Sequence, residues 1–323
     1  MSFRVLGTGS CLPSRVVSNR ELSESIDTSD EWITQRVGVR ERRICTIETT
    51  TVLAYNAAKA AFEQSGVAPG DLDMIICATV SAENAAPSLA CSVQSMLGAE
   101  CPAMDINAAC SGFIYALDTA AGFFSRGMKR ILVAGAERLS GMIDWNDRST
   151  AVIFGDGAGA MVLGEGTEYL ASKLYARGND TVLSIPNRAG ASPYYEISPP
   201  APYIRMNGQE TFKFAVNAMC KDLIDVVDAA GLAMDDIAWV VPHQANARII
   251  DASAKKLGIP QDRCLKNIDK VGNTSAASIP ILFDELHRSG KLCDGDNIAM
   301  CSFGAGLTSA ACVIKWKAIS NAK

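Results

Sequence analysis

The chain has 323 residues, of which 48% are hydrophobic and 20% charged, and its net charge is −5. This composition predicts a globular chain with a large core and excludes an intrinsically disordered one. The acidic balance gives no reason to expect nucleic acid as a partner, because a phosphate-binding surface needs an excess of Lys and Arg.

No apolar stretch is long enough to cross a bilayer, which takes about 20 residues. Residues 1–9 also lack the charged and apolar regions of a secretory signal. The 11 cysteines include no CxxC pair and lie among apolar residues, which favours reduced thiols in a cytoplasmic protein. With two histidines and no clustered Cys and His spacing, we expect no metal site.

The first predicted strand covers residues 3–7. Within residues 57–79 a helix, a turn and an apolar strand at 74–77 follow, and residues 219–243 repeat this order. Three landmarks recur at an offset of 165 residues without a gap, namely Gly66, Asp71 and Ile75, then Gly231, Asp236 and Val240. Residues 105–127 and 269–290 each run from a strand end into a helix, and apolar strands follow at 130–135 and 297–302.

The repeat predicts two similar α/β halves, residues 1–166 and 167–323, and not a solenoid, whose repeats are shorter. Chance similarity among generic βα units remains an alternative. Alternation of helices with continuous apolar strands predicts mostly parallel, buried sheets. Residues 167–208 contain five prolines, so we expect connecting and surface structure there, which could border a binding site.

Cys110 is the candidate nucleophile. A predicted strand ends near Ile106 and a helix begins near Gly112, so Cys110 lies in a strand-to-helix turn among small neighbours. The free N–H groups and partial positive charge of a helix N-terminus lower the pKa of a thiol and favour the thiolate. Taken alone, the position also fits a buried structural cysteine, because the chain has 11 of them.

His243 and Asn273 are the candidate partners. His243 follows a buried strand at its C-terminal end, where open α/β sheets place their chemistry. His287 lies at the polar end of a helix, where a histidine usually complements the helix dipole. Asn273 lies in a Gly-Asn turn that the repeat aligns with the Cys110 turn, although an ordinary turn and helix cap would look the same.

These residue types suit thioester chemistry. A cysteine sulfur can attack an acyl thioester and hold the acyl group. A histidine nitrogen and an asparagine amide can donate hydrogen bonds to a thioester enolate in a dry pocket. The backbone N–H groups of Gly304, Ala305 and Gly306 could form an oxyanion hole, or this could be a plain glycine-rich turn.

Six stretches resemble the signatures of the β-ketoacyl-acyl carrier protein synthase III family, in the family's order and over nearly the whole chain. They are DEWI at 30–33, GVRER at 38–42, DINAACSGF at 105–113, FGDGAG at 154–159, VPHQAN at 241–246 and GNTSAAS at 272–278. The resemblance implies the thiolase fold, with duplicated αβαβαββ halves that form a five-layered α-β-α-β-α core, and a homodimer.

The resemblance also implies a reaction, the decarboxylative Claisen condensation of a short acyl-CoA primer with malonyl-acyl carrier protein. The product is β-ketoacyl-acyl carrier protein, which initiates fatty acid biosynthesis. Cys110 would carry the acyl group, while His243 and Asn273 would promote loss of CO₂ and stabilise the enolate. No cofactor is implied, because the CoA thioesters are substrates.

Further positions carry roles by resemblance. Trp32 and Arg148 resemble the pair that sandwiches the CoA adenine, and Arg36 resembles the residue on the CoA phosphates. The CoA channel is matched by Met206, Gly208, Phe212, Asn246 and Ile249. The carrier-protein contact is matched by Gln244, Ala245, Asn246, Ala247 and Arg248, to which Lys213, Lys255 and Lys256 add a local basic patch. These lysines could equally be solvated helix charges.

Two positions depart from the family pattern. Ala86 stands where the family often has Phe at the primer pocket, across the dimer, so the primer need not be acetyl. Ala305 stands where three glycines in a row are common, and we expect little effect because its N–H remains. The alternatives are a secondary-metabolism acyltransferase with the same triad, a non-catalytic acyl- or carrier-protein-binding member, and a thioesterase.

Overall fold

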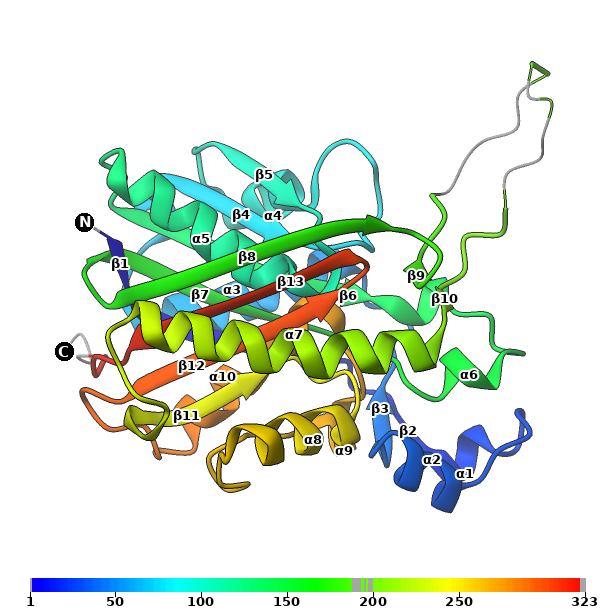
Figure 1. Ribbon diagram of the computed structural model, residues 1–323. Helices are drawn as coiled ribbons and strands as arrows, with labels where there is room; N and C mark the ends of the chain where they lie inside the picture. Colours follow the sequence, from blue (N-terminus) through cyan, green and yellow to red (C-terminus); the bar gives the residue numbers. More distant parts are fainter. Residues whose placement is uncertain (1, 188–192, 195, 197–199, 320–323) are drawn as a thin grey trace.

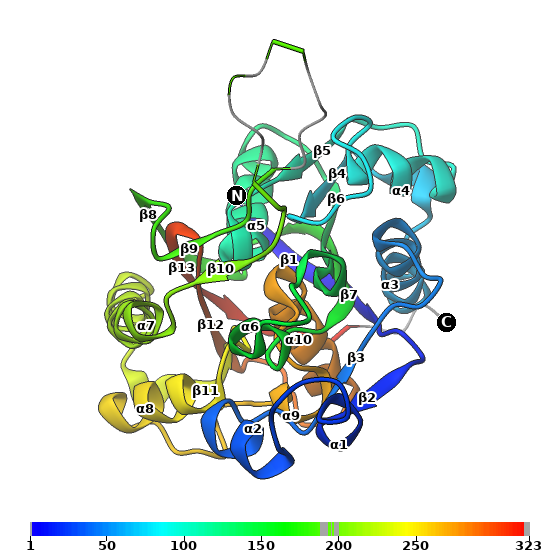
Figure 2. The ribbon, with the colours of Figure 1, turned by 90° about the vertical axis from the view of Figure 1, so that its right-hand side faces the viewer.

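Two β-sheets alternate with three layers of helices in the computed structural model, which describes residues 2–187, 193, 194, 196 and 200–319 (Figures 1 and 2). The first sheet has the order β1 (Ser2–Cys11), β7 (Asp156–Gly166), β6 (Arg130–Arg138), β4 (Met74–Ala78) and β5 (Ala103–Ile106). The second sheet has the order β11 (Ile237–Pro242), β12 (Asn297–Gly304), β13 (Gly306–Lys315) and β8 (Tyr169–Asn179).

Helices cover both faces of each sheet. The outer layers are α3 (Thr50–Ser65) with α4 (Leu89–Leu97), and α7 (Gly208–Ala229) with α8 (Ala247–Leu257), while α5 (Gly112–Ser125) and α10 (Ser278–Arg288) lie between the sheets (Figure 2). Because strand side chains alternate, Ile76 and Val133 pack in the central layer and Ile75 and Leu132 against the outer one. The five-layered thiolase architecture is thereby confirmed.

The smaller elements gather at one end of the sheets (Figure 1). They are β2 (Val16–Ser18), α1 (Asn19–Leu22), α2 (Asp30–Arg36), β3 (Glu41–Arg43), the 3₁₀ turn η3 (Leu139–Met142), α6 (Arg148–Ala151), β9 (Leu183–Ser184), β10 (Arg205–Met206) and α9 (Ile268–Val271). Arg42 of β3 is fully buried and donates to the Asn19 Oδ1 and Val152 carbonyl oxygens at 2.9 and 3.0 Å. This guanidinium therefore ties the N-terminal elements to the segment before β7.

The internal repeat is visible in the strand order. β1-β7-β6-β4 in the first sheet corresponds to β8-β13-β12-β11 in the second. The 3₁₀ turns η1 (Pro69–Asp71) and η2 (Ala109–Ser111) correspond to η4 (Met234–Asp236) and η5 (Ser275–Ala277). A parallel bridge between Val240 and Cys264 takes the place of β5. All strands of the first sheet precede residue 167 and all those of the second follow it, which supports the proposed division into halves.

The expectation of mostly parallel sheets is wrong. In the two large sheets, β4 pairs in parallel with β5 and β6, and β11 with β12, but the other four pairings are antiparallel. β7 and β13 are apolar along their length because helices cover both faces of each sheet. A continuous apolar run in the sequence therefore indicates that both faces of a strand are buried. It does not indicate whether the strand pairs in parallel or antiparallel.

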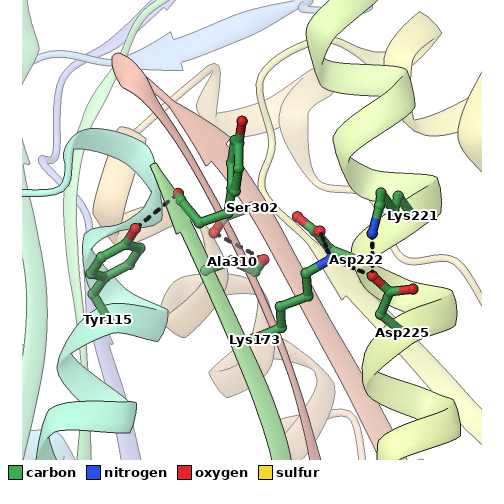
Figure 3. A network of polar contacts seen from close by, with 8 residues as sticks. Tyr115, Lys173, Lys221, Asp222, Asp225, Ser302 and Ala310 are labelled. Carbon is green, nitrogen blue, oxygen red and sulfur yellow. Dashed lines mark hydrogen bonds and ion pairs between the residues drawn. The ribbon is translucent and has the colours of Figure 1, made fainter. Parts of the chain in front are cut away.

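The expectation that residues 167–208 form connecting structure is wrong for their first part. β8 is an edge strand of 11 residues, and α5 and α7 fasten it from two sides (Figure 3). Lys173 pairs with the buried Asp222 at 2.8 Å and also with Asp225, while the Tyr115 hydroxyl donates to the Tyr175 carbonyl at 2.9 Å. The sequence did not show this strand because none of its residues is fully buried, and only Tyr169 and Ala171 are both apolar and half-buried.

Described residues from the rest of that region border the central pocket, as expected. Leu183, Ile185, Ile204 and Met206 all line it. Of the five prolines in the region, Pro199 lies outside the described residues.

His287 joins the two halves. Its Nδ1 lies 3.0 Å from the Thr8 Oγ1 of β1, and its ring centroid lies 5.0 Å from that of Trp316. Thr8 and Ser10 also donate to the buried Asp284 of α10, at 2.7 Å each. The histidine thus does more than complement the dipole of its helix, because α10 of the second half is hydrogen-bonded to the first strand of the first half.

Replacing Gly135 by Ala should disrupt the packing between the halves. A Cβ on Gly135 would lie 2.3 Å from the Ala276 carbonyl oxygen, a backbone atom that cannot move aside as a flexible side chain could. We expect the free energy of unfolding, measured with urea, to fall by about 3 kcal/mol or more. Gly122→Ala in α5 is the control, because nothing lies within 4 Å of a Cβ there and Ala stabilises a helix by about 1 kcal/mol relative to Gly. Equal stability of Gly135→Ala and the parent would contradict this account.

Candidate active site

Cys110 lies in a turn that two neighbouring segments hold in place. The chain leaves β5 at Ile106, turns through η2 and enters α5, which begins without a side-chain cap. Ala109 has a left-handed backbone with φ 48°. From the second half, Thr308 Oγ1 donates to the Ala108 carbonyl at 3.0 Å. A Cβ on Gly304 would lie 2.7 Å from the Cys110 nitrogen, so only glycine lets the predicted oxyanion loop approach the nucleophile this closely.

The expectation of a lowered pKa for Cys110 is wrong. Burial raises the pKa of its thiol to about 12, and the charge of Glu137 acts in the same direction, while a hydrogen bond with Ser275 opposes the shift. Desolvation of the charged form therefore outweighs the field of the helix N-terminus. The resting sulfur is therefore a neutral thiol.

His243 is fixed by its backbone and by packing, and its ring nitrogens are left without partners. It follows β11, where its N–H donates to the Cys301 carbonyl at 2.8 Å, and its ring lies edge-on to Phe303 at 5.4 Å. Neither ring nitrogen has a hydrogen-bond partner within the described residues, although the residue is 1% exposed. Burial lowers the pKa of the imidazole to about 3, so the ring is neutral at physiological pH.

Asn273 is held so that one end of its amide remains available. Its Oδ1 accepts from the Ser275 N–H at 2.8 Å, its own N–H donates to the Ile153 carbonyl at 2.9 Å, and its carbonyl accepts from the Gly155 N–H at 3.0 Å. Asn107 makes the matching turn in the first half, where its Oδ1 accepts from the Ala109 N–H at 3.3 Å. Because the Asn273 oxygen is engaged by this turn, the NH₂ group is the end that can donate to a ligand.

One pocket of about 250 Å³ brings the three residues together. Its other lining residues are mostly apolar, as expected for a small-molecule site. Eleven of the residues that the sequence singled out line this pocket: Trp32, Cys110, Met206, Gly208, Phe212, His243, Ala245, Asn246, Ile249, Asn273 and Ala305.

The other proposed residues lie outside the pocket lining. At its mouth, the Arg148 guanidinium lies over the Trp32 ring at 5.4 Å from the centroid, and Arg248 over Phe212 at 5.7 Å. Arg36, Ala247, Lys213, Lys255 and Lys256 lie on or near the surface, as does Ala86. Gly304 and Gly306 flank Ala305 behind the nucleophile.

The prediction for Gln244 is wrong. It was expected in a carrier-protein contact, but it is fully buried and cannot reach a partner. Its Nε2 donates to the Pro242 carbonyl at 2.8 Å, and its Oε1 accepts from the Asn267 and Ile268 N–H groups at 3.0 and 3.2 Å. Gln244 therefore anchors the His243 strand end to the segment that leads to Asn273.

Sequence reasoning missed Ser275 and Glu137. Ser275 lines the pocket in a left-handed conformation with φ 50°, and Glu137 is fully buried at the end of β6. The repeat could have indicated Ser275, because it matches Ala109 beside the nucleophile. Glu137 carried no such signal, since the pair Glu137-Arg138 after an apolar strand is typical of a solvated strand end.

Two classes of feature are absent from the part of the chain that the structure describes. Its residues include no group of three or more His, Cys, Asp and Glu side chains that could hold a metal ion. In the same part of the chain, no helix has both the length and the apolar character of a membrane span.

Known proteins resemble this chain in sequence and in structure. Sequence models for 3-oxoacyl-[acyl-carrier-protein] synthase III and for its C terminal match residues 104–178 and 227–316. The beta-ketoacyl-[acyl-carrier-protein] synthase III of Aquifex aeolicus is 46% identical over 98% of this chain and 100% of its own length. The one of Oceanobacillus iheyensis is 45% identical over 98% and 99%.

Solved structures agree over the same length. The crystal structure of 3-oxoacyl-[acyl-carrier-protein] synthase III from Aquifex aeolicus superposes with a TM-score of 0.92, covering 97% of this chain and 100% of that one. The priming β-ketosynthase of the R1128 polyketide biosynthetic pathway also has a TM-score of 0.92, at 35% identity and with 99% and 97% covered. The chain belongs to the β-ketoacyl-acyl carrier protein synthase III family.

Proposed function

We propose that Cys110, His243 and Asn273 divide between them the condensation by which this family of acyltransferases initiates fatty acid biosynthesis. The observation that carries the proposal is the imidazole of His243, which has no hydrogen-bond partner among the described residues and is buried in the same pocket as Cys110 and Asn273. A buried polar group without a partner costs about 1–3 kcal/mol, and a thioester oxygen would offset this cost.

In the first step, the Cys110 sulfur attacks the thioester carbonyl of a short acyl-CoA. The acyl group moves to the sulfur and CoA leaves as a thiol. Backbone N–H groups of the loop Gly304-Ala305-Gly306 would hold the developing oxyanion, which the close approach of Gly304 to the Cys110 backbone supports.

In the second step, malonyl-acyl carrier protein occupies the same pocket. As CO₂ leaves, the electrons that remain form a thioester enolate, to whose oxygen His243 and Asn273 would donate. Since the imidazole is neutral, it would stabilise the enolate by hydrogen bonding without protonating it. The enolate carbon then attacks the acyl-cysteine, the bond between the acyl carbon and the Cys110 sulfur breaks, and the sulfur regains a proton as the β-ketoacyl-carrier protein departs. Thiol, imidazole and amide suffice for these steps, so we propose no cofactor.

The mouth of the pocket suits CoA. Trp32 and Arg148 would hold the adenine between them, Arg36 would contact the phosphates, and the pantetheine would pass Met206, Gly208, Phe212, Asn246 and Ile249. Optimal contact distances are about 3.5–4.0 Å on each face of an adenine, so the Trp32 ring and the Arg148 guanidinium would lie about 7 Å apart around it. Arg148, at 5.4 Å from the Trp32 centroid, would therefore move away from the ring when CoA binds.

Ala86 bears on the choice of primer. It lies exposed in the loop before α4, and we propose that it bounds the primer pocket of a second copy in a homodimer. β5, the edge strand of the first sheet, would offer its free edge to that copy. The small side chain leaves room for a primer other than acetyl, including one from secondary metabolism.

Sedimentation equilibrium tests the dimer, and a monomer at micromolar concentration would rule out this role for Ala86. We place the reaction in the cytoplasm.

Substitution within the triad should separate the two steps. Cys110→Ala should abolish acyl transfer from CoA but retain some decarboxylation of malonyl-carrier protein, because His243 and Asn273 remain. His243→Ala and Asn273→Ala should still self-acylate but lose decarboxylation by about 10²-fold or more, as expected for the loss of an oxyanion donor.

Intact-mass measurement after incubation with a panel of acyl-CoAs reports the adduct and the preferred chain length, and release of CO₂ reports the second step. Elongation by Cys110→Ala at the parental rate would show that Cys110 is not the nucleophile. Absence of any adduct on the parent protein would favour the non-catalytic alternative.

The basic patch should matter for the carrier protein alone. Lys255 and Lys256 end α8, and Lys256 Nζ lies 3.5 Å from Asn217 of α7, one helical turn after Lys213. Replacing both by Glu should raise the KM for malonyl-carrier protein on the order of tenfold, more at low salt, through repulsion of an acidic partner. Self-acylation by acyl-CoA should be unchanged. Lys291→Glu is the control, because Lys291 follows the C-terminal end of α10 and belongs to neither α7 nor α8. An equal effect of this variant would argue against a local patch.

A further inference from the structure

Glu137 is a buried carboxyl group that the reaction described above does not use. It ends β6 beside the active site and has no exposed surface. Its carboxylate accepts from the Ser81 hydroxyl at 2.5 Å, from Thr79 Oγ1 at 3.3 Å and from the Val80 N–H at 3.2 Å. Within the described part of the chain Glu137 has no ion pair, and a fully buried carboxyl group without a cationic partner is costly to keep in a fold.

Ser275 connects this carboxyl group to the nucleophile. The Ser275 side chain is hydrogen-bonded both to Cys110 and to Glu137. Its backbone has φ 50°, and its N–H is held by Asn273 Oδ1 at 2.8 Å. The left-handed turn that orients Asn273 thus also places the Ser275 hydroxyl between the thiol and the carboxyl group.

The groups around Glu137 leave one ionisable neighbour on this path. Arg138, the next residue, points to the opposite face of the strand and is paired in register with Asp156 of β7. Asp156 accepts from the Cys45 and Ser140 N–H groups at 2.8 and 2.9 Å and has no hydrogen bond to Ser275 among the described residues. Cys110 is therefore the titratable group that Ser275 connects to Glu137.

We propose that Glu137 is the positioning and proton-accepting residue for acylation of Cys110, acting through the hydroxyl of Ser275. As the sulfur attacks the acyl-CoA carbonyl, the S–H bond breaks and its proton moves to Ser275 Oγ. The Ser275 hydroxyl hydrogen moves to the Glu137 carboxylate, so that Ser275 ends unchanged and Glu137 ends neutral. The negative charge passes to the tetrahedral oxyanion and then to the departing CoA thiolate. This thiolate takes the proton from Glu137, so the carboxylate is restored.

The alternative acceptor is His243. Burial raises the pKa of Glu137 to about 7 and lowers that of His243 to about 3. Of the two groups, the Glu137 carboxylate is therefore the stronger base. This difference supports the path through Ser275 and leaves His243 as a neutral donor for the second step.

The test rests on the proposed function and uses the Glu137→Gln and Ser275→Ala variants of the full chain. The rate of self-acylation by acetyl-CoA is measured by rapid quench and intact mass from pH 5.5 to 9. The parent rate should rise with pH through an inflection near 7, as Glu137 ionises. Glu137→Gln should lose about 10²-fold in rate, a usual contribution of a general base, and should lose the inflection, while the KM for acetyl-CoA stays the same. Ser275→Ala should slow acylation similarly.

Two comparisons separate this role from a structural one. Asp156→Asn removes the other fully buried carboxylate at this strand end and should keep the inflection near pH 7. Decarboxylation of malonyl-carrier protein should be equal in Cys110→Ala and in the Cys110→Ala, Glu137→Gln double variant. Acylation of Glu137→Gln at the parental rate with the parental pH profile would overturn the proposal, as would an equal loss in both half-reactions. Absence of acylation in the parent would instead overturn the proposed function itself.

Discussion

The structure depends on the close approach of two turns to two strands, across the boundary between the halves. Gly304, at the end of β12, leaves no space for a Cβ beside the Cys110 nitrogen, and Gly135 of β6 leaves none beside the Ala276 carbonyl. Each half thus presses its strand end against the helix-starting turn of the other. This contact places the predicted oxyanion loop directly behind Cys110, the proposed nucleophile, and it exists because backbone packs on backbone, which side chains would prevent.

The two halves supply equivalent positions and unequal chemistry. Cys110 matches Ala276 at an offset of 166 residues, and Ser275 matches Ala109, while His243 matches Ala78 at an offset of 165. Asn273 matches Asn107, and both side chains close the same turn through Oδ1. The turn is therefore a property of the scaffold, and in the proposed site one half provides the sulfur while the other provides the hydrogen-bond donors. Alanines at the matching places keep the second strand-end cluster free of competing polar groups.

The sequence predicted the strands and helices around the site well, because apolar runs, glycine stops and the repeat are local signals. Cys110, His243 and Asn273 could be named since each follows a predicted buried strand. The failures share a different cause. The direction of β7 and β13, the burial of Gln244, and the burial of Glu137 depend on what packs against them from distant parts of the chain. A charged pair such as Glu137-Arg138 looks the same in sequence whether water or a serine hydroxyl faces the carboxylate.

Burial also explains why the groups of the site resist carrying a charge. The pKa values of the Cys110 thiol and the Glu137 carboxyl are raised, and that of the His243 imidazole is lowered, with desolvation as the largest cause in all three. A pocket that disfavours charge also disfavours the carboxylate of a malonyl group, which escapes this penalty by leaving as CO₂. The enolate that remains spreads its charge over an oxygen that hydrogen-bond donors can reach, and such bonds are stronger at low dielectric. The same dryness makes the first step harder, because a thiol has to lose its proton there. A nearby carboxylate whose pKa is raised by burial accepts that proton at a smaller free-energy cost than a solvated carboxylate would. Desolvation therefore suits a buried glutamate to the first step, just as it suits a neutral histidine to the second.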